Sequence, residues 1–239
     1  MSQVLKPSSR CLRAGPVLLL TALLLTACAG PLKQLAYSVR ESPENAAFDP
    51  AILRGKKLTF LTATVTTGNE QYRSLTTLSL AHAFTKLNSE LGAILVLPRE
   101  GLNRININGL SDEYARMMLS YEKTGVLKKE TISKIGRAIG VDYVVQPSLV
   151  KFSQIRRTRI TLFGVRLVET VESSVRVSME LWHCESGRAL WNGWAVTTVA
   201  GEDIRARYVR FEEVAEIAYS RLLKVLLENT SRKGNQGKK

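Results

Sequence analysis

The fold is decided by one stretch of the chain, Ile132-Ser133-Lys134-Ile135-Gly136-Arg137-Ala138-Ile139-Gly140-Val141-Asp142-Tyr143-Val144-Val145, in which a helical pattern gives way to an extended one. Ile132, Ile135 and Ile139 recur at spacings of three and four, the period of a helix with one apolar side. Gly140 is the residue type that most often ends such a helix. The β-branched and aromatic run that follows is typical of a buried strand. We therefore expect a helix over 130–139 that leads directly into a strand.

Upstream of this unit the pattern changes between strand and helix several times. Leu58–Val65 is rich in β-branched residues and predicts a strand. Arg73–Leu91 has apolar residues at helical spacing and ends at Gly92, which predicts an amphipathic helix. A short strand is expected over 93–97, a loop over 99–110 and a further helix over 111–122.

Downstream, three or four strand-like runs follow one another without a helix, which predicts an antiparallel meander. Apolar and polar residues alternate over Val175–Leu181, so this strand should bury one face and expose the other. Glu185-Ser186-Gly187 is the expected turn into the next strand. The apolar phase of Arg159–Leu167 shifts between Leu162 and Phe163, which suggests a bulge. A long closing helix is expected from Phe211, Val214, Ala218, Leu222 and Val225.

The amino-terminal segment has the parts of a bacterial secretion signal: a basic region through Arg13, an apolar run over Val17–Leu25 and small residues at its end. Leu25-Thr26-Ala27-Cys28 resembles the lipobox of bacterial lipoproteins, which implies that Cys28 becomes the first residue and carries acyl chains. Ala29, where inner-membrane lipoproteins have aspartate, implies sorting to the outer membrane. The alternative is an ordinary signal peptide that is cut after Ala29.

Composition and punctuation give the domain organisation. With 239 residues, 45% hydrophobic and 23% charged, the chain has the composition of a globular protein with one domain. We expect a lipoprotein signal peptide over 1–27 and a lipidated tether over 28–56, because Pro31, Pro43 and Pro50 interrupt a segment without sustained periodicity. A single periplasmic α/β domain should occupy 57–229, and a disordered basic tail 230–239.

Two passages of this domain resemble the envelope lipoproteins related to the TolB amino-terminal domain, CsgG and LpoB. The first is Ile132–Val145, with its helix, glycine stop and Gly-Val-Asp-Tyr strand; the second is Met179–Trp191, with its Glu-Ser-Gly turn between strands. As an arrangement of elements the resemblance covers about residues 57–228. It implies an α+β fold, with a mixed and largely antiparallel sheet and helices packed on one face. It brings no catalytic residue with it.

Signatures of common enzyme classes are absent from the sequence, including the phosphate-binding loop, His-Glu-x-x-His, Cys-x-x-Cys and Gly-x-Ser-x-Gly. His82 is expected on a helix surface and His183 at a strand end. Cys184, the one cysteine left in the mature chain, is expected to be a small buried residue. We assign no catalytic residue, no metal ligand and no cofactor. Three tryptophans are expected as core residues or cross-strand partners: Trp182, Trp191 and Trp194.

The excess of 34 Lys+Arg over 21 Asp+Glu gives a net charge of +13, which suits an acidic polymer or an anionic surface. Arg156, Arg157 and Arg159 are expected at a strand end or hairpin tip, where they either form a solvated turn or contact lipid or an acidic partner. Nucleic acid is a poor candidate partner, since the chain is secreted and has no recognition motif.

These observations favour an outer-membrane lipoprotein that is attached to the membrane through acylated Cys28. Its periplasmic domain would be non-enzymatic and would bind another envelope protein. The alternative is an oligomeric secretion-channel subunit resembling CsgG, which would need long paired strands with an unbroken apolar face. The broken phase of 159–169 and the shortness of Val175–Leu181 weigh against it. An envelope enzyme that uses Cys184 or His183 ranks third. The partner's identity and homo-oligomerisation stay open.

Overall fold

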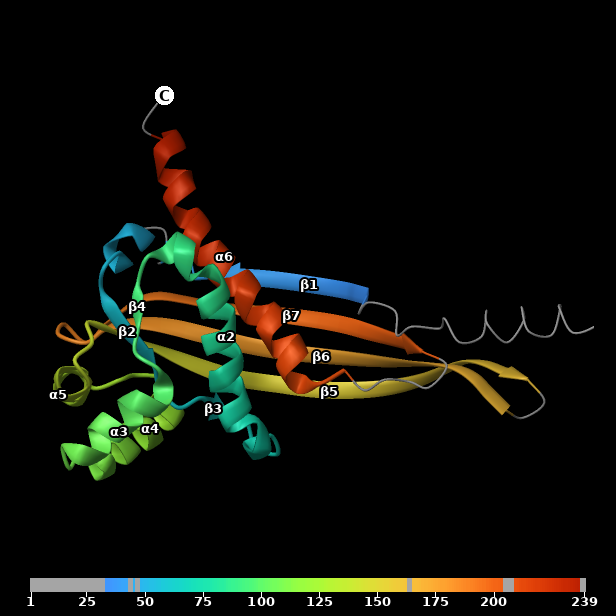
Figure 1. Ribbon diagram of the computed structural model, residues 1–239, viewed down its shortest axis with the longest axis horizontal. Coiled ribbons are helices and arrows are strands. Elements are labelled where there is room, and N and C mark those ends of the chain that lie inside the picture. The colour runs from blue at the N-terminus through green and yellow to red at the C-terminus, as the bar shows by residue number, and fades with distance from the viewer. Residues whose placement is uncertain (1–32, 43–44, 46–47, 163–164, 204–208, 237–239) are drawn as a thin grey trace, which may run out of the picture.

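A computed structural model describes residues 33–42, 45, 48–162, 165–203 and 209–236 (Figure 1). Its centre is a seven-stranded sheet in the order β1-β7-β6-β5-β2-β4, with β3 also paired to β5. The strands are β1 Lys33–Glu41, β2 Lys57–Phe60, β3 Thr64–Val65, β4 Ile94–Leu95, β5 Tyr143–Leu162, β6 Val165–His183 and β7 Arg188–Asp203. The α-helices are α2 Arg73–Leu91, α3 Pro98–Ile107, α4 Ser111–Thr124, α5 Lys129–Ile139 and α6 Phe211–Gln236, and short 3-10 helices cover Pro50–Leu53 and Glu70–Tyr72.

The predicted fold class is confirmed: an α+β protein with a mixed, mostly antiparallel sheet and helices packed on it. β2 pairs in parallel with β4 and β5, and β3 also runs parallel to β5. The remaining ladders, β5–β6, β6–β7 and β1–β7, are antiparallel. None of the described helices combines the length and apolarity that a bilayer crossing requires.

The passage between α5 and β5 joins three elements. Gly140 ends α5 in the left-handed conformation, with φ 78°, as its position in the sequence predicts. The backbone N–H of Asp142 donates to Lys57 O over 2.9 Å, and the Asp142 carboxylate accepts from Lys57 N over 3.0 Å. The carbonyl of Asp142 also accepts from Cys184 N over 2.9 Å. The Gly-Val-Asp-Tyr passage therefore fixes the start of β5 beside the start of β2 and the end of β6.

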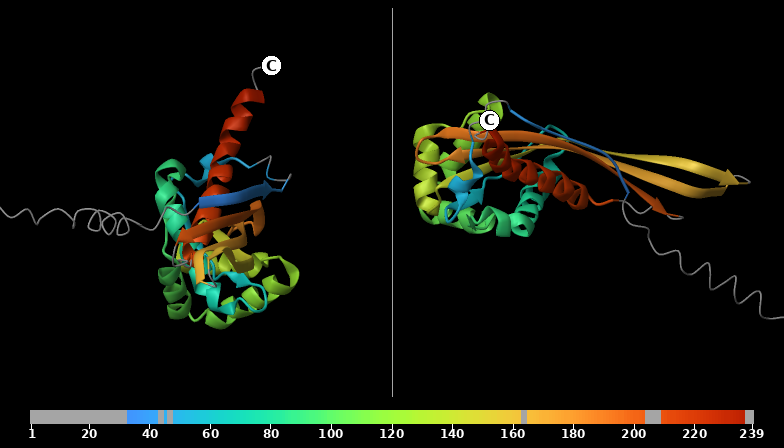
Figure 2. Two further views of the ribbon diagram at one scale, coloured as in Figure 1. Left: turned by 90° about the vertical axis from the view of Figure 1, so that its right-hand side faces the viewer. Right: turned by 90° about the horizontal axis from the view of Figure 1, so that it is seen from above.

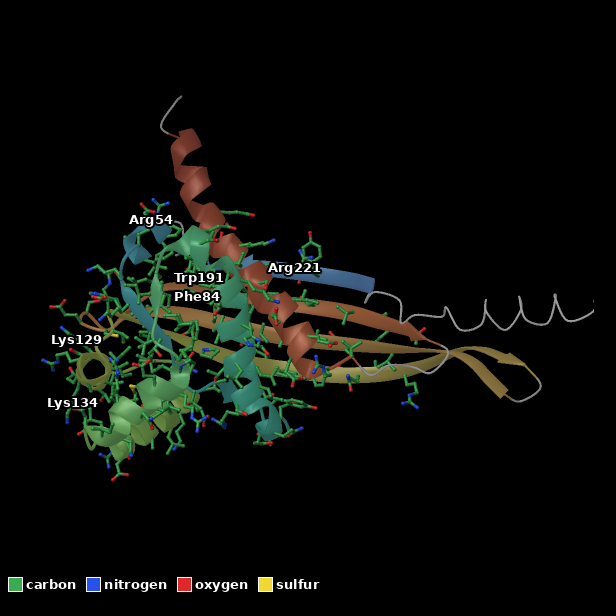
Figure 3. The ribbon with its side chains drawn as sticks, viewed as in Figure 1. Arg54, Phe84, Lys129, Lys134, Trp191 and Arg221 are labelled. Atoms are coloured by element: carbon green, nitrogen blue, oxygen red, sulfur yellow. The ribbon has the colours of Figure 1, made fainter. Side chains whose placement is uncertain are left out.

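Helices cover both faces of the sheet, whereas the sequence predicts them on one face. We call the face under α2 and α6 the front; Val145 and Leu181 lie in its core, which also includes Phe84 and Trp191 (Figure 3). Val144 and Trp182, their chain neighbours, lie in a second core with residues of α3, α4 and α5. Because successive strand residues point to opposite faces, this second core lies on the back of the sheet. Figure 2 shows α4 and α5 gathered at one end of the sheet, so among the described residues helices cover the back only there.

The hairpin of β5 and β6 is longer than the sequence predicts. It pairs from Tyr143 with His183 out to Leu162 with Val165, and its outer part extends beyond the helices (Figure 1). The short strand expected over Val175–Leu181 is only the alternating part of β6. Its outer part was missed because register shifts at Thr158/Ile160 and Ile160/Thr161 interrupt the alternation. The bulge expected between Leu162 and Phe163 falls outside the described residues.

Two segments that the sequence assigns to irregular structure form regular elements. The expected loop over 99–110 is wrong, because Pro98–Ile107 is the helix α3. Proline occupies its first turn, and Glu100 and Arg104 form an ion pair one turn apart. Within the expected tether, Lys33–Glu41 forms edge strand β1 against β7. The missed signal is the alternation of Leu35, Tyr37 and Val39 with smaller or polar residues.

The closing helix α6 confirms the expected helix and continues to Gln236, into the segment 230–239 that was predicted to be a disordered tail. Its buried residues run from Phe211 to Leu226 and pack on the front of the sheet. Arg221 of α6 lies over the Tyr37 ring, 3.7 Å from its centroid, and so connects the helix to edge strand β1 (Figure 3).

Gly136 provides a test of the back core. A Cβ atom at this position would lie 2.6 Å from Cys184 Cβ and 2.7 Å from its Sγ, because α5 approaches β6 closely there. We expect Gly136→Ala to lower the free energy of unfolding by about 1–3 kcal/mol, as overpacked cores do. Urea unfolding followed by circular dichroism measures this change.

The control is Gly101→Ala in α3, where the nearest atom to an added Cβ is Thr59 Oγ1 at 3.2 Å. A smaller loss is expected there, since alanine favours a helix over glycine by about 1 kcal/mol. Equal unfolding midpoints for the two variants would contradict the close packing of α5 on Cys184.

Candidate functional site

The uncovered part of the back face carries a cluster of cations around one tryptophan. Arg40 of β1 is the register partner of Trp194 on β7, and Arg176 of β6 is the register partner of Lys151 on β5. Arg176 alternates with Val175 and Val177 of the front core, so it lies on the back. We call Arg40, Lys151, Arg176 and Trp194 the basic-aromatic face.

Trp194 lies between two guanidinium groups. The guanidinium carbon of Arg176 is 4.6 Å from the centroid of the indole ring, and that of Arg40 is 5.5 Å from it. Both distances allow cation–π attraction, which holds the arginines near the ring. The ring is half-buried, whereas Arg40, Arg176 and Lys151 are exposed. The three cations reach solvent from neighbouring strands around a rigid aromatic centre.

Carboxylates do not neutralise this cluster: among the residues that the structure describes, neither Arg40, Arg176 nor Lys151 forms a salt bridge. Elsewhere on the domain exposed cations do have acidic partners, for example Arg73 with Glu122 and Lys134 with Glu113. The basic-aromatic face therefore has a positive potential of its own.

A buried polar network forms the border between this face and α4. Trp182 Nε1 donates to Glu180 Oε2 over 3.0 Å, and the Tyr121 hydroxyl of α4 also hydrogen-bonds the Glu180 carboxylate. Burial raises the pKa of Glu180, and the hydrogen bonds from Tyr121 and Trp182 oppose that rise. Burial, together with the charge of Glu180, raises the pKa of Tyr121. α4 is thus fixed as a wall beside the open face.

The two candidates for an enzyme site do not form a catalytic pair. His183 lies against the Tyr143 ring, with centroids 5.2 Å apart, and its Nδ1 is 3.0 Å from Ser186 Oγ. Cys184 instead packs in the back core against Gly136. Burial, and then the charge of Asp142, raise the pKa of the Cys184 thiol to about 12, so it stays protonated and a poor nucleophile.

The remaining predicted residues are placed apart from one another. His82 is exposed on α2, 3.9 Å from Glu216 of α6, as expected for a helix surface. Within the described residues, no group of three or more His, Cys, Asp or Glu side chains is arranged to hold a metal ion. Arg156 is exposed and pairs in register with Val171, and Arg157 pairs with Thr170. The basic cluster with Arg159 therefore lies along the outer part of β5 and not at the turn.

The tryptophans divide between core and surface. Trp182 and Trp191 are core residues, as the sequence predicts, whereas Trp194 is the cross-strand partner of Arg40 on the open face. Sequence reasoning placed Arg176 on the exposed side of its strand but missed the cluster. The signal that was missed is the alternation within β1, which would have brought Arg40 into the sheet.

No family model matches the chain, and no curated protein matches it. Solved structures do. The PelC dodecamer from Paraburkholderia phytofirmans is 16% identical, with a TM-score of 0.45, over 80% of this chain and 98% of that one. Lipoprotein GNA1162 from Neisseria meningitidis is 10% identical, with a TM-score of 0.35, over 74% and 99%. The LpoB carboxy-terminal domain from Salmonella enterica is 15% identical, with a TM-score of 0.32, over 65% and 98%. LpoB is thus among the similar structures; the resemblance to TolB and CsgG stays a prediction.

Alkylation tests the state of Cys184. Because its thiol is buried and protonated, we expect the native protein to resist iodoacetamide at pH 8 and to react fully in denaturing urea. Mass spectrometry of the peptide that contains Cys184 measures both reactions. Modification in the native state at the rate of free cysteine would contradict the buried position and reopen the enzyme hypothesis.

The pH dependence of stability tests the Glu180 network. A raised pKa means that the folded state holds the Glu180 proton more tightly than the unfolded state. Stability should therefore fall as the pH rises from the ordinary glutamate value of 4.5 through the raised folded pKa. Glu180→Gln should remove this fall and unfold at a higher temperature than the wild type above that window.

The matched control is Glu185→Gln at the exposed turn between β6 and β7. Thermal unfolding of the three proteins across a series of pH values makes the comparison. If Glu180→Gln and wild type lose stability in parallel with pH, the carboxyl group does not have the raised pKa.

Proposed function

We propose that this chain is a lipid-anchored envelope protein, non-enzymatic, whose periplasmic domain binds another envelope protein through the basic-aromatic face. The observation that carries the proposal is an uncovered sheet face with three exposed cations around Trp194, none of which has an acidic partner among the described residues. Ordinary surfaces intersperse both signs of charge. Aromatic residues and arginine are also the types enriched at protein interfaces.

The proposed anchor lies close to this face in the sequence. Lys33, the first residue of β1, is the fifth residue after Cys28, so the connecting chain spans at most about 17 Å. Two or three acyl chains on Cys28 would hold the domain firmly on a bilayer. The domain would then stay near the inner surface of the outer membrane, and its partner would be a protein that can reach this layer.

The chemistry of the described residues supports a binding role. His183 and Cys184 line the same pocket, but His183 contacts the Tyr143 ring, and burial raises the pKa of the Cys184 thiol and keeps it unreactive. Catalysis by acyl transfer needs a nucleophile beside a base. The basic-aromatic face offers positive charge and an aromatic ring but no such pair. Recognition is the activity that these groups provide.

A second candidate, the secretion-channel subunit, is favoured by the hairpin alone. β5 and β6 are 20 and 19 residues long, so the strand length that the sequence argued against is present. Register shifts at Leu149/Lys151 and Thr158/Ile160 still break the alternation that a lipid-facing strand needs. A stable oligomer that conducts ions across planar bilayers would favour this candidate over the interaction domain.

Two measurements test the proposal. The intact mass of the membrane-extracted protein should correspond to a chain that begins at Cys28 and carries a diacylglyceryl group. The Cys28→Ala variant should lose both the added mass and the membrane association. A photocrosslinking residue at Ser38, on the back of β1, should then give one discrete protein adduct in cells. The same residue at Glu90 on α2 is the control and should not give it.

An unmodified chain that begins after Ala29 would refute the anchor. Adducts that are diffuse, or equal from Ser38 and Glu90, would refute binding through this face.

A further inference from the structure

The geometry points to a short, extended, acidic segment of the partner protein as the occupant of the basic-aromatic face, lying across strands β1, β7, β6 and β5. This inference rests on the proposed function and names the chemistry that the same face recognises. It follows from three features of the described residues: the spacing of the cations, their lack of acidic partners, and the helical wall beside them.

The cations are spaced for more than one carboxylate. Arg40 and Arg176 both approach the Trp194 ring, so a carboxylate beside the ring is within reach of two guanidinium groups. Charge-assisted hydrogen bonds from arginine are about twice as strong as neutral ones, and its planar fork matches a carboxylate. Lys151, the register partner of Arg176, provides a second position one strand further on. Two acidic side chains can therefore be bound at once.

The dimensions fit an extended segment. Neighbouring strands lie about 4.8 Å apart, so the row from β1 to β5 spans about 14 Å, which four or five extended residues cover. Ser178, the register partner of Trp194, contributes a hydroxyl group to this surface, whereas the hydroxyl of its other register partner, Ser148, is 2.6 Å from Thr64 Oγ1. These small polar side chains leave room for a chain to lie close to the sheet.

The wall beside the floor argues against a flat membrane as the occupant. Helices α3, α4 and α5 pack on the same face, and Tyr121 of α4 is hydrogen-bonded to Glu180 of β6. A helical layer rises about 10 Å from the sheet under it. A planar bilayer would meet this layer before it reached Trp194, whereas a single extended segment fits the angle between floor and wall.

Binding of a defined peptide tests the inference. The probe is a rhodamine-labelled peptide of alternating glutamate and serine, seven residues long, added to the full-length lipidated protein in a neutral detergent. We expect saturable binding by fluorescence anisotropy, weakening steeply with salt. Arg176→Glu and Arg40→Glu should each weaken binding at least tenfold, and Arg176→Lys, which keeps the charge, should weaken it less.

The matched control is Lys224→Glu, an equal charge change at an exposed position of α6 on the other face. Lys224→Glu should leave binding within about twofold of the wild type. The wild type should not bind a peptide with lysine in place of glutamate, which distinguishes the sign of the charge from hydrophobicity as the cause of binding. Urea midpoints of all variants confirm that they fold. Equal weakening by Lys224→Glu and Arg176→Glu would overturn the inference, since attraction would then come from net charge alone.

Other occupants give distinct results. If anionic phosphatidylglycerol nanodiscs, and not the peptide, lose binding in Arg176→Glu, the face recognises lipid phosphate and the inference is overturned. If sedimentation shows self-association that Arg176→Glu abolishes, the occupant is a second copy of this chain. A discrete Ser38 adduct without peptide binding overturns the acidic segment and leaves the proposed function standing. Peptide binding without a discrete Ser38 adduct leaves the recognition of an acidic segment standing and overturns the proposed binding of an envelope protein.

Discussion

Strand β5 is the constraint on which the rest of the structure depends, because two kinds of pairing meet on it. Its first residues run parallel to β2 and antiparallel to β6, and the Asp142 carboxylate ties its start to Lys57. Alternate residues of β5 then supply two cores: Val145 and Leu149 face α2 and α6, and Val144 faces α3–α5. A one-residue slip of this strand would exchange the two cores, so its register fixes both layers.

The open face follows from how the two helical layers are shared along the sheet. On the front, α2 and the long α6 cover β6 from Val175 to Leu181 and β7 from Trp191 to Val199. On the back, the helices between β4 and β5 are short and stay near the start of β5. No described helix therefore covers the parts of β5, β6 and β7 on the hairpin side of Glu180. Residues there need not be apolar, and the chain places Arg176, Ser178 and Trp194 among them.

Local chemistry was predictable from the sequence, and pairing between distant segments was not. Gly92 and Gly140 end α2 and α5 as expected, since a left-handed residue is a local requirement. β1 was missed because three prolines dominate the composition of its segment and only a short alternation marks it as a strand; its partner, β7, lies more than a hundred residues away. The site was missed for the same reason: Arg40 and Arg176 become neighbours only across β7.

The cation cluster is not an arrangement that the fold needs. Like charges directly opposite each other on paired strands are destabilising, and Arg176 and Lys151 are direct register partners. Attraction between Trp194 and its two arginines offsets part of that repulsion, but cation–π contacts at exposed sites contribute only about 0.5–1 kcal/mol each. A single aspartate or glutamate in place of Ser178 or Ser38 would relieve the repulsion between the cations without changing a residue of either core. A sheet whose only task was to fold would gain from that change, so the uncompensated charge is best explained by a ligand that supplies the missing carboxylates.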